Sequence, residues 1–440
     1  MTALYFRDAR LIDPASGMDE NGCLIVQDGV ISAAGSAGAV GKPPKDTTII
    51  DARGAVLAPG LIDMRVQSRN PGHAYKESRA SLARAAAAGG ITSMVCLPNT
   101  DPVLDDPDSL SALIRPDQGL ESPRLYAYGA ATRGLEDKAM AELGLLAEAG
   151  AVGFTNANRP IADSLVMRRI MDYAAMLDKP VIQHAEDPSL ANDGEMHESE
   201  NSTRLGLRGI PAEAEEIMIA RDLTLARLTG ARYHVAHAST RKGINLIRQA
   251  KADGISVTCD TAPPYFMLND LALMEYDTRF QLSPPLRSED DRQAIREAIA
   301  DGTIDCIASD HAPHDRDSKL LPFGLAARGA SGLETLLAMV IGLSIDGVIS
   351  LKRGLEMVST APATLFDLPG GSLTPGSAAD LVLIDPERGW QVRGDAFHSL
   401  SASTPFEGQP VQGAVIGTWV GGTRIPVSYT HLRAHETSNH

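Results

Sequence analysis

The 440-residue sequence has few cysteines and no long apolar run, and both scarcities restrict what the protein can be. Its four cysteines are far apart and form no Cys-x-x-Cys pair, which argues against a disulfide framework or a structural zinc site. No apolar run reaches the roughly 18 residues of a membrane span. The first residues also lack the basic and apolar regions of a signal peptide. We therefore expect a cytoplasmic protein.

Positive charge is scarce as well. Lys and Arg number 40 against 56 Asp and Glu, giving a formal net charge of -16, and no basic run stands out. This balance argues against a nucleic acid or an anionic membrane as the main partner. The chain is too long for one small core, whereas a barrel of about 250 residues plus an accessory domain would account for its length.

The order of apolar segments predicts an α/β fold with two parts. Residues 3–58 alternate short β-rich runs with turns, and the β-rich pattern returns after Leu373. Between them, apolar strand segments alternate with amphipathic helical stretches, the clearest being 213–228 and 289–300. The predicted strand segments are 93–97, 151–154, 180–183, 233–236, 256–259 and 304–308. This alternation indicates a (β/α)8 TIM barrel.

We accordingly expect a barrel over residues 59–360 and a small β-sandwich built from both chain ends, residues 1–58 and 361–427. The last residues, 428–440, have no hydrophobic period and resemble a translated cloning adapter, so we interpret them as a non-native tail.

The segment Pro59–Gly72 resembles the first metal-binding strand of the class I dihydroorotases of the amidohydrolase superfamily. In that family the pattern is Pro-Gly-x-(Ile/Val)-Asp-x-His-Val-His-x-Arg-x-Pro-Gly. Here Arg65 and Gln67 stand where the family has its two metal-binding histidines. Arginine has no free lone pair and does not deprotonate in proteins, so it cannot ligate a cation.

Three polar residues each close an apolar strand segment, where barrel enzymes place their chemistry. His184 begins His-Ala-Glu, His237 begins His-Ala-Ser-Thr, and Asp310 lies in Ser-Asp-His-Ala-Pro-His. Any one alone would more often be a hydrogen-bonded core residue. Together they resemble family metal ligands, and the resemblance gives Asp310 the further role of taking the proton from the nucleophilic water.

The resemblance also implies a bridging carboxylate in a Phe-Thr-Asp-Asp-Gly segment. Here the segment is Phe154-Thr155-Asn156-Ala157-Asn158, and Asn156 replaces a family ligand. Zinc sites of this kind need at least three protein ligands. The family implies zinc, and with His184, His237 and Asp310 as a partial set we expect zinc to be weakly bound or absent.

The residues that bind the substrate in the family are matched more closely in this sequence than its metal ligands are. Arg69 matches the arginine that grips the substrate carboxylate, for which a planar guanidinium is suited. Asn99 in Pro-Asn-Thr and His314 in Asp-His-Ala-Pro-His match the other substrate-binding residues. Ser283 departs from the usual asparagine, and Pro264-Tyr265 replaces the usual pair of histidines. For Arg69, a buried arginine that ties loops together is an equally good interpretation.

Two kinds of function follow from the resemblance. One is a weakly active or non-catalytic member of de novo pyrimidine biosynthesis, a partner of aspartate carbamoyltransferase in an oligomeric assembly. The chain resembles such members at 64–66, 282–292 and 404–408. The other is an active, metal-dependent hydrolase of a small cyclic amide, either a dihydroorotase or a related allantoinase. No Gly-x-Ser-x-Gly elbow, P-loop or dinucleotide fingerprint offers another catalytic system.

Overall fold

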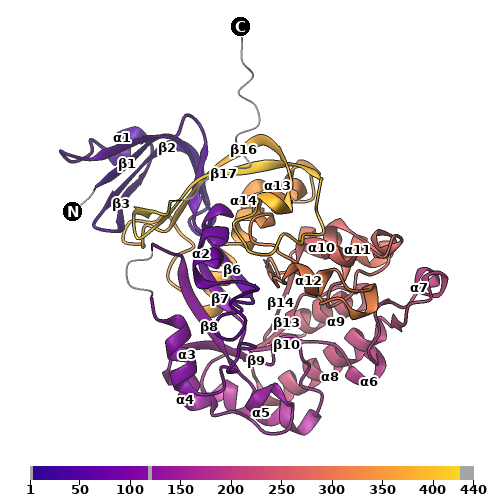
Figure 1. Ribbon diagram of the computed structural model, residues 1–440. Helices are drawn as coiled ribbons and strands as arrows, with labels where there is room; N and C mark the ends of the chain where they lie inside the picture. The colour runs from indigo at the N-terminus through magenta and orange to yellow at the C-terminus, as the bar shows by residue number, and fades with distance from the viewer. Residues whose placement is uncertain (1–2, 117–120, 427–440) are drawn as a thin grey trace.

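The computed structural model describes residues 3–116 and 121–426 and contains a parallel barrel beside a β domain (Figure 1). The predicted tail at 428–440 lies outside the described residues. The barrel strands follow the order β15-β14-β13-β10-β9-β8-β7-β6, and neighbouring strands in this order are parallel. Their bounds are β6 Leu61–Val66, β7 Ile91–Cys96, β8 Arg124–Ala130, β9 Ala151–Thr155, β10 Val181–His184, β13 Tyr233–Ala236, β14 Val257–Thr261 and β15 Cys306–Ile307.

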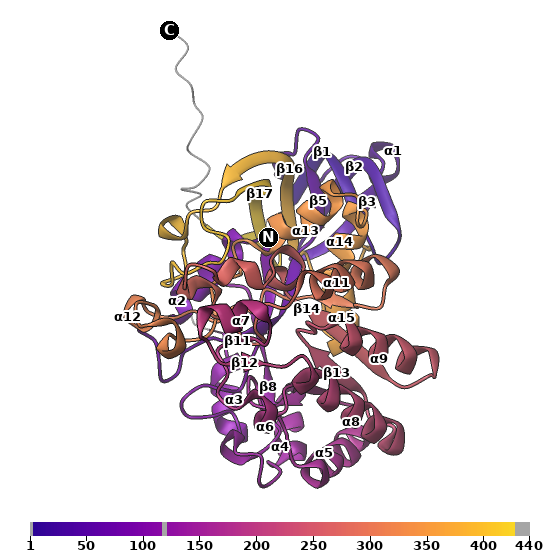
Figure 2. The same cartoon turned by 90° about the vertical axis from the view of Figure 1, so that its right-hand side faces the viewer.

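Helices follow most of these strands and pack on the outside of the barrel, where the predicted stretches at 213–228 and 289–300 form α8 and α11 (Figures 1 and 2). The larger helices are α2 Arg79–Ala88, α3 Pro107–Ile114, α4 Leu143–Glu148, α5 Ser164–Met176, α8 Glu213–Thr229, α9 Arg241–Ala252, α11 Glu289–Asp301, α13 Leu336–Ile345, α14 Leu351–Met357 and α15 Thr360–Phe366. Shorter elements carry the loops at the barrel mouth: α6 Pro188–Ala191, β11 Met196–His197, α7 Glu200–Leu205, β12 Gly209–Ile210, α10 Pro263–Met267 and α12 Arg316–Lys319. None of the helices in the described ranges is both long enough and apolar enough to cross a membrane.

Local sequence accounts for the helix boundaries. Helix α5 begins after Asp163, whose carboxylate accepts hydrogen bonds from two backbone N–H groups of the first turn. Helix α8 ends at Gly230, which takes the left-handed conformation (φ 70°) that glycine tolerates at a helix end.

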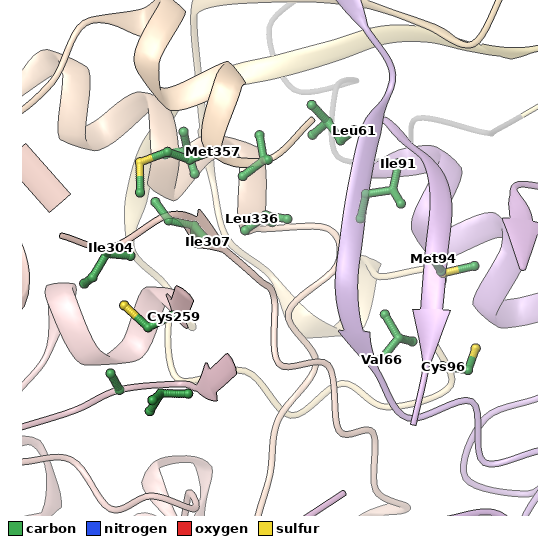
Figure 3. Close-up of a cluster of buried hydrophobic side chains, with 14 of the residues drawn as sticks. Leu61, Val66, Ile91, Met94, Cys96, Cys259, Ile304, Ile307, Leu336 and Met357 are labelled. Carbon is green, nitrogen blue, oxygen red and sulfur yellow. The ribbon is translucent and has the colours of Figure 1, made fainter. Parts of the chain in front are cut away.

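The barrel closes between its first and last strands. Figure 3 shows Leu61 of β6 and Ile91 of β7 in one hydrophobic cluster with Ile307 of β15. The predicted strand at 304–308 is shortened to the two residues of β15, although the N–H groups of Asp305 and Ala308 still donate to Cys259 O and Thr261 O of β14.

Strands from both ends of the chain form one eight-stranded sheet, visible in Figure 2 where β16 and β17 lie beside β1 and β5. Its strands are β1 Leu4–Asp13, β2 Met18–Gln27, β3 Val30–Gly35, β4 Thr48–Asp51, β5 Val56–Pro59, β16 Leu381–Gln391, β17 Pro410–Val420 and β18 Thr423–Arg424, with the short helix α1 Ala37–Val40 after β3. Phe6 and Trp419 meet edge to face in its core, with ring centroids 5.0 Å apart. The predicted fold class, a TIM barrel with a small β-sandwich domain made from both chain ends, is confirmed.

Candidate functional site

The residues that the sequence singled out lie at the C-terminal ends of the barrel strands. Arg65 is near the end of β6, His184 ends β10, His237 follows β13 and Asp310 follows β15. Parallel strands end on one side of a barrel, so these side chains converge although up to 245 residues separate them in sequence.

Arg65 is the centre of this group. Its side chain is only 2% exposed, Nε donates to Asp310 Oδ1 at 2.9 Å, and Nη2 donates to Asn158 Oδ1 at 2.7 Å. Desolvation raises the pKa of the Asp310 carboxyl above its usual range, and the guanidinium opposes that shift. One carboxylate oxygen of Asp310 is therefore committed to a fixed internal cation.

Gln67, at the other replaced histidine position, is tied to the substrate side. It is 3% exposed, and its Oε1 accepts from Asn99 Nδ2 at 3.2 Å. Its Nε2 is a buried donor without a hydrogen-bond partner in the described structure. An amide in this place offers hydrogen bonds, whereas an imidazole would offer a lone pair to a metal.

The two asparagines after β9 make different contacts. Asn156 turns away from Arg65: its Oδ1 accepts from the Thr132 backbone and hydroxyl, each at 3.1 Å. Asn158 instead contacts Arg65. The sequence pattern singled out Asn156 and missed Asn158, because the direction of each side chain depends on the loop, where Ala157 has a positive φ of 58°.

His184 and His237 contact each other. His184 Nδ1 lies 3.2 Å from His237 Nε2, so one of the two nitrogens carries the proton and the other accepts it. Burial, together with the Arg65 charge, holds the pKa of His237 well below its usual range, which keeps this ring neutral. Glu186 Oε1 is 3.7 Å from His184 Nε2.

These side chains do not fit a zinc ion in their present arrangement. A metal needs several free lone pairs directed at one point, but the two histidines bond to each other and Asp310 bonds to a cation. In the described ranges, no group of three or more His, Cys, Asp or Glu could hold a metal ion.

Arg69 and His314 of the predicted substrate side lie together. Arg69 Nε donates to Pro313 O at 3.0 Å, and Nη2 lies 3.0 Å from His314 Nε2. That histidine nitrogen is also 2.8 Å from Arg328 O, and it can serve only one of these two contacts. Burial lowers the pKa of Arg69 to about 10. None of its hydrogen-bond partners among the described residues is a carboxylate.

A pocket opens beside Asp310 and Asn158, where the empty space, with the adjoining open solvent included, is about 470 Å³. Its wall includes Ser283 and the Pro264-Tyr265 pair, so some of the positions where the sequence departs from the family pattern face this space. It also includes Arg328, which no motif pointed to, and Pro405-Phe406 from the β domain. Sequence patterns could not place Arg328 here, because its loop is brought to the barrel mouth by tertiary contacts alone.

A family profile and individual relatives both indicate similarity to dihydroorotases. A family profile described as "Dihydro-orotase-like" matches residues 54–243. Proteins named dihydroorotase from Syntrophus aciditrophicus and Pelobacter propionicus are 42% and 43% identical over 419 residues, which is 95% of this chain and 98% of each of theirs.

Solved structures of similar shape include an L-hydantoinase (dihydropyrimidinase) from Arthrobacter aurescens, with a TM-score of 0.85, 27% identity and coverage of 97% of this chain and 96% of that one. A dihydropyrimidinase from Brevibacillus agri has a TM-score of 0.83, covers 98% of this chain and 96% of that one, and at 23% identity supports the fold alone.

Proposed function

This chain belongs to the dihydroorotase family, and on that premise we propose that it is a weakly active or non-catalytic member that serves pyrimidine biosynthesis as a structural partner of aspartate carbamoyltransferase. The contact between Arg65 and Asp310 is the observation that supports weak or absent catalytic activity. Hydrolysis of a cyclic amide by the family reaction needs an activated water and a free carboxylate to take its proton.

Arg65 opposes both requirements. Its guanidinium holds one oxygen of Asp310, and its charge opposes the rise in the pKa of this carboxyl that burial causes, so Asp310 is a weaker base than it would be without Arg65. Its fixed positive charge is also unfavourable for a divalent cation in the same space. A zinc ion would lower the pKa of a bound water to about 7, and without a metal ion the water in this site is a poor nucleophile.

An active cyclic-amide hydrolase is the second candidate, and the contact between Arg69 and His314 favours it. A buried guanidinium without a carboxylate partner is suited to the carboxylate of a small substrate, and Asn99 hydrogen-bonds to Gln67, two residues from Arg69. The ring could be dihydroorotate or an allantoin-like amide. Under this alternative the protein would act on a small molecule and would need a metal ligand set different from the present one.

The proposed partner rests on the resemblance at 64–66, 282–292 and 404–408. The acidic net charge argues against nucleic acid as the partner. All four cysteines are buried and free, as suits a cytoplasmic protein.

The test combines an assay with co-purification. We expect the chain expressed with the aspartate carbamoyltransferase of the same organism to co-purify with it and to slow its thermal inactivation. We also expect negligible turnover of dihydroorotate by the purified chain, with or without added zinc. The variant Asp310→Asn keeps a hydrogen-bond acceptor for Arg65 and should leave the partner's activity unchanged. Turnover of dihydroorotate that Asp310→Asn abolishes would instead establish the second candidate.

A further inference from the structure

We propose that the Arg65 guanidinium is a permanent internal cross-link that holds the closing seam of the barrel, so that this part of the fold needs no metal ion. The seam is the junction between β6 and the segment that follows β15. The proposal goes beyond the loss of activity, because it gives the arginine a positive structural role that does not depend on any partner.

The seam has few backbone hydrogen bonds. Strands β6 and β15 stand at opposite ends of the eight-strand order, and an isolated bridge between Val66 and His311 joins the two sides. The Gln67 N–H donates to His311 O at 2.9 Å, and the Ser309 N–H donates to the Asp63 carboxylate. With a last strand of only two residues, side chains must provide much of this closure.

Arg65 crosses the seam and also reaches a third strand. Its Nε binds Asp310 on the far side of the seam, and its Nη2 binds Asn158 in the loop after β9. The planar guanidinium fixes the angle between these two hydrogen bonds, so it sets the spacing of three strand ends at once. Its backbone N–H, 3.2 Å from Asp63 Oδ1, anchors the arginine in the same junction.

Charge balance supports a permanent role. The side chain of Arg65 is almost wholly buried, and a buried cation is costly unless a carboxylate compensates it. Asp310 supplies that charge, and each side chain therefore requires the other. Near this junction, His184 and His237 at the ends of β10 and β13 bond to each other through one nitrogen of each ring, and His237 Nδ1 has no partner among the described residues.

Thermal unfolding of the full chain tests the proposal. The melting temperature of the unaltered protein should be the same with a chelator and with added zinc. Arg65→Met keeps the length of the side chain but leaves the Asp310 carboxylate unpaired, and should lower the melting temperature by about 3–5 °C. The double variant Arg65→Met/Asp310→Leu removes both charges and should recover much of that loss.

Arg133→Met is the matched control, because Arg133 forms an exposed ion pair with Glu142. It should shift the melting temperature by less than about 1 °C. Hydrogen exchange gives the local measurement: Arg65→Met should speed exchange at Gln67 and Ser309, whose N–H groups close the seam, more than at Val382 in the β domain. If Arg65→Met yields no soluble protein, the urea midpoint of Arg65→Lys tests the proposal instead. Lysine keeps the positive charge but has a single nitrogen, so it cannot reproduce the two hydrogen bonds from Nε and Nη2, and the midpoint should fall.

A melting temperature that falls with chelator or rises by several degrees with zinc would overturn the proposal. So would an Arg65→Met protein as stable as the unaltered chain, or an Arg65→Lys midpoint equal to it. These outcomes are separate from the test of the proposed function, because they depend on neither dihydroorotate turnover nor co-purification.

Discussion

Asp380 accepts two hydrogen bonds from the guanidinium of Arg124, from Nε at 2.8 Å and from Nη2 at 3.1 Å. Arg124 begins barrel strand β8, and Asp380 immediately precedes β16 of the β domain. The same carboxylate accepts from the Gly421 N–H at 2.7 Å. One aspartate thus joins the barrel to a turn at the C-terminal end of the β domain.

Replacing Asp380 with alanine should therefore destabilise the protein. The change leaves the Gly421 N–H and the Arg124 guanidinium without their acceptor, and because the arginine is partly exposed we expect a loss of about 1–2 kcal/mol in the free energy of unfolding. Urea unfolding measures it. Asp51→Ala, which removes an exposed ion pair with Arg7, is the control and should change the free energy of unfolding much less. Equal losses in the two variants would contradict the role given to Asp380.

His314 should make the protein less stable in acid. Burial lowers its pKa to about 3, and the charges of Arg69, Lys76 and Lys319 act in the same direction. An unfolded histidine has a pKa of about 6.5, so between these values the unfolded chain binds a proton that the native protein does not. This contribution to stability is complete above pH 6.5 and is lost as the pH falls towards 3.

The measurement is the melting temperature of the unaltered chain and of His314→Gln at several pH values between 7 and 4. The glutamine variant should lose less stability as the pH falls from 7 to 4, because the side chain at position 314 no longer titrates in this range. Parallel curves for the two proteins would show that His314 does not control the acid sensitivity.

Zinc content should be well under one ion per subunit in the purified chain. The reason is that Arg65 and Gln67 supply no metal ligand, while the remaining histidines bond to each other. Elemental analysis after purification without a chelator measures it. One or two stoichiometric metal ions would refute the prediction, and His184→Ala and His237→Ala would then identify the ligands.

The sequence predicted the parts of this structure that depend on local pattern. Period and apolar runs located β13 at 233–236 and helix α8 from Glu213, because a strand or helix buries one repeated set of positions. The resemblance to the dihydroorotase family implied that Arg65 and Asp310 belong to one site. It could not show that they bind each other, since that contact joins residues 245 apart and depends on how the barrel closes. Nor could it show that Asn158 contacts Arg65 while Asn156 contacts Thr132, because these contacts depend on the path of a loop.

Glu77 should hold the segment 397–406 against the barrel, although no sequence motif singled it out. Its buried carboxylate accepts hydrogen bonds from the hydroxyl groups of Ser81 and Ser399 and from the Leu400 N–H, and the same segment carries Phe406 into the wall of the pocket.

Glu77→Ala would remove the carboxylate that accepts from these buried groups, so we expect a loss of about 3 kcal/mol in the free energy of unfolding and faster hydrogen exchange at 398–406. Glu77→Gln keeps an acceptor of the same shape and should cost less. Exchange that rises equally over the whole chain in Glu77→Ala would mean that the residue supports the fold generally. A local rise confined to this segment would establish Glu77 as its anchor and make the shape of the pocket depend on a residue outside the strand-end site.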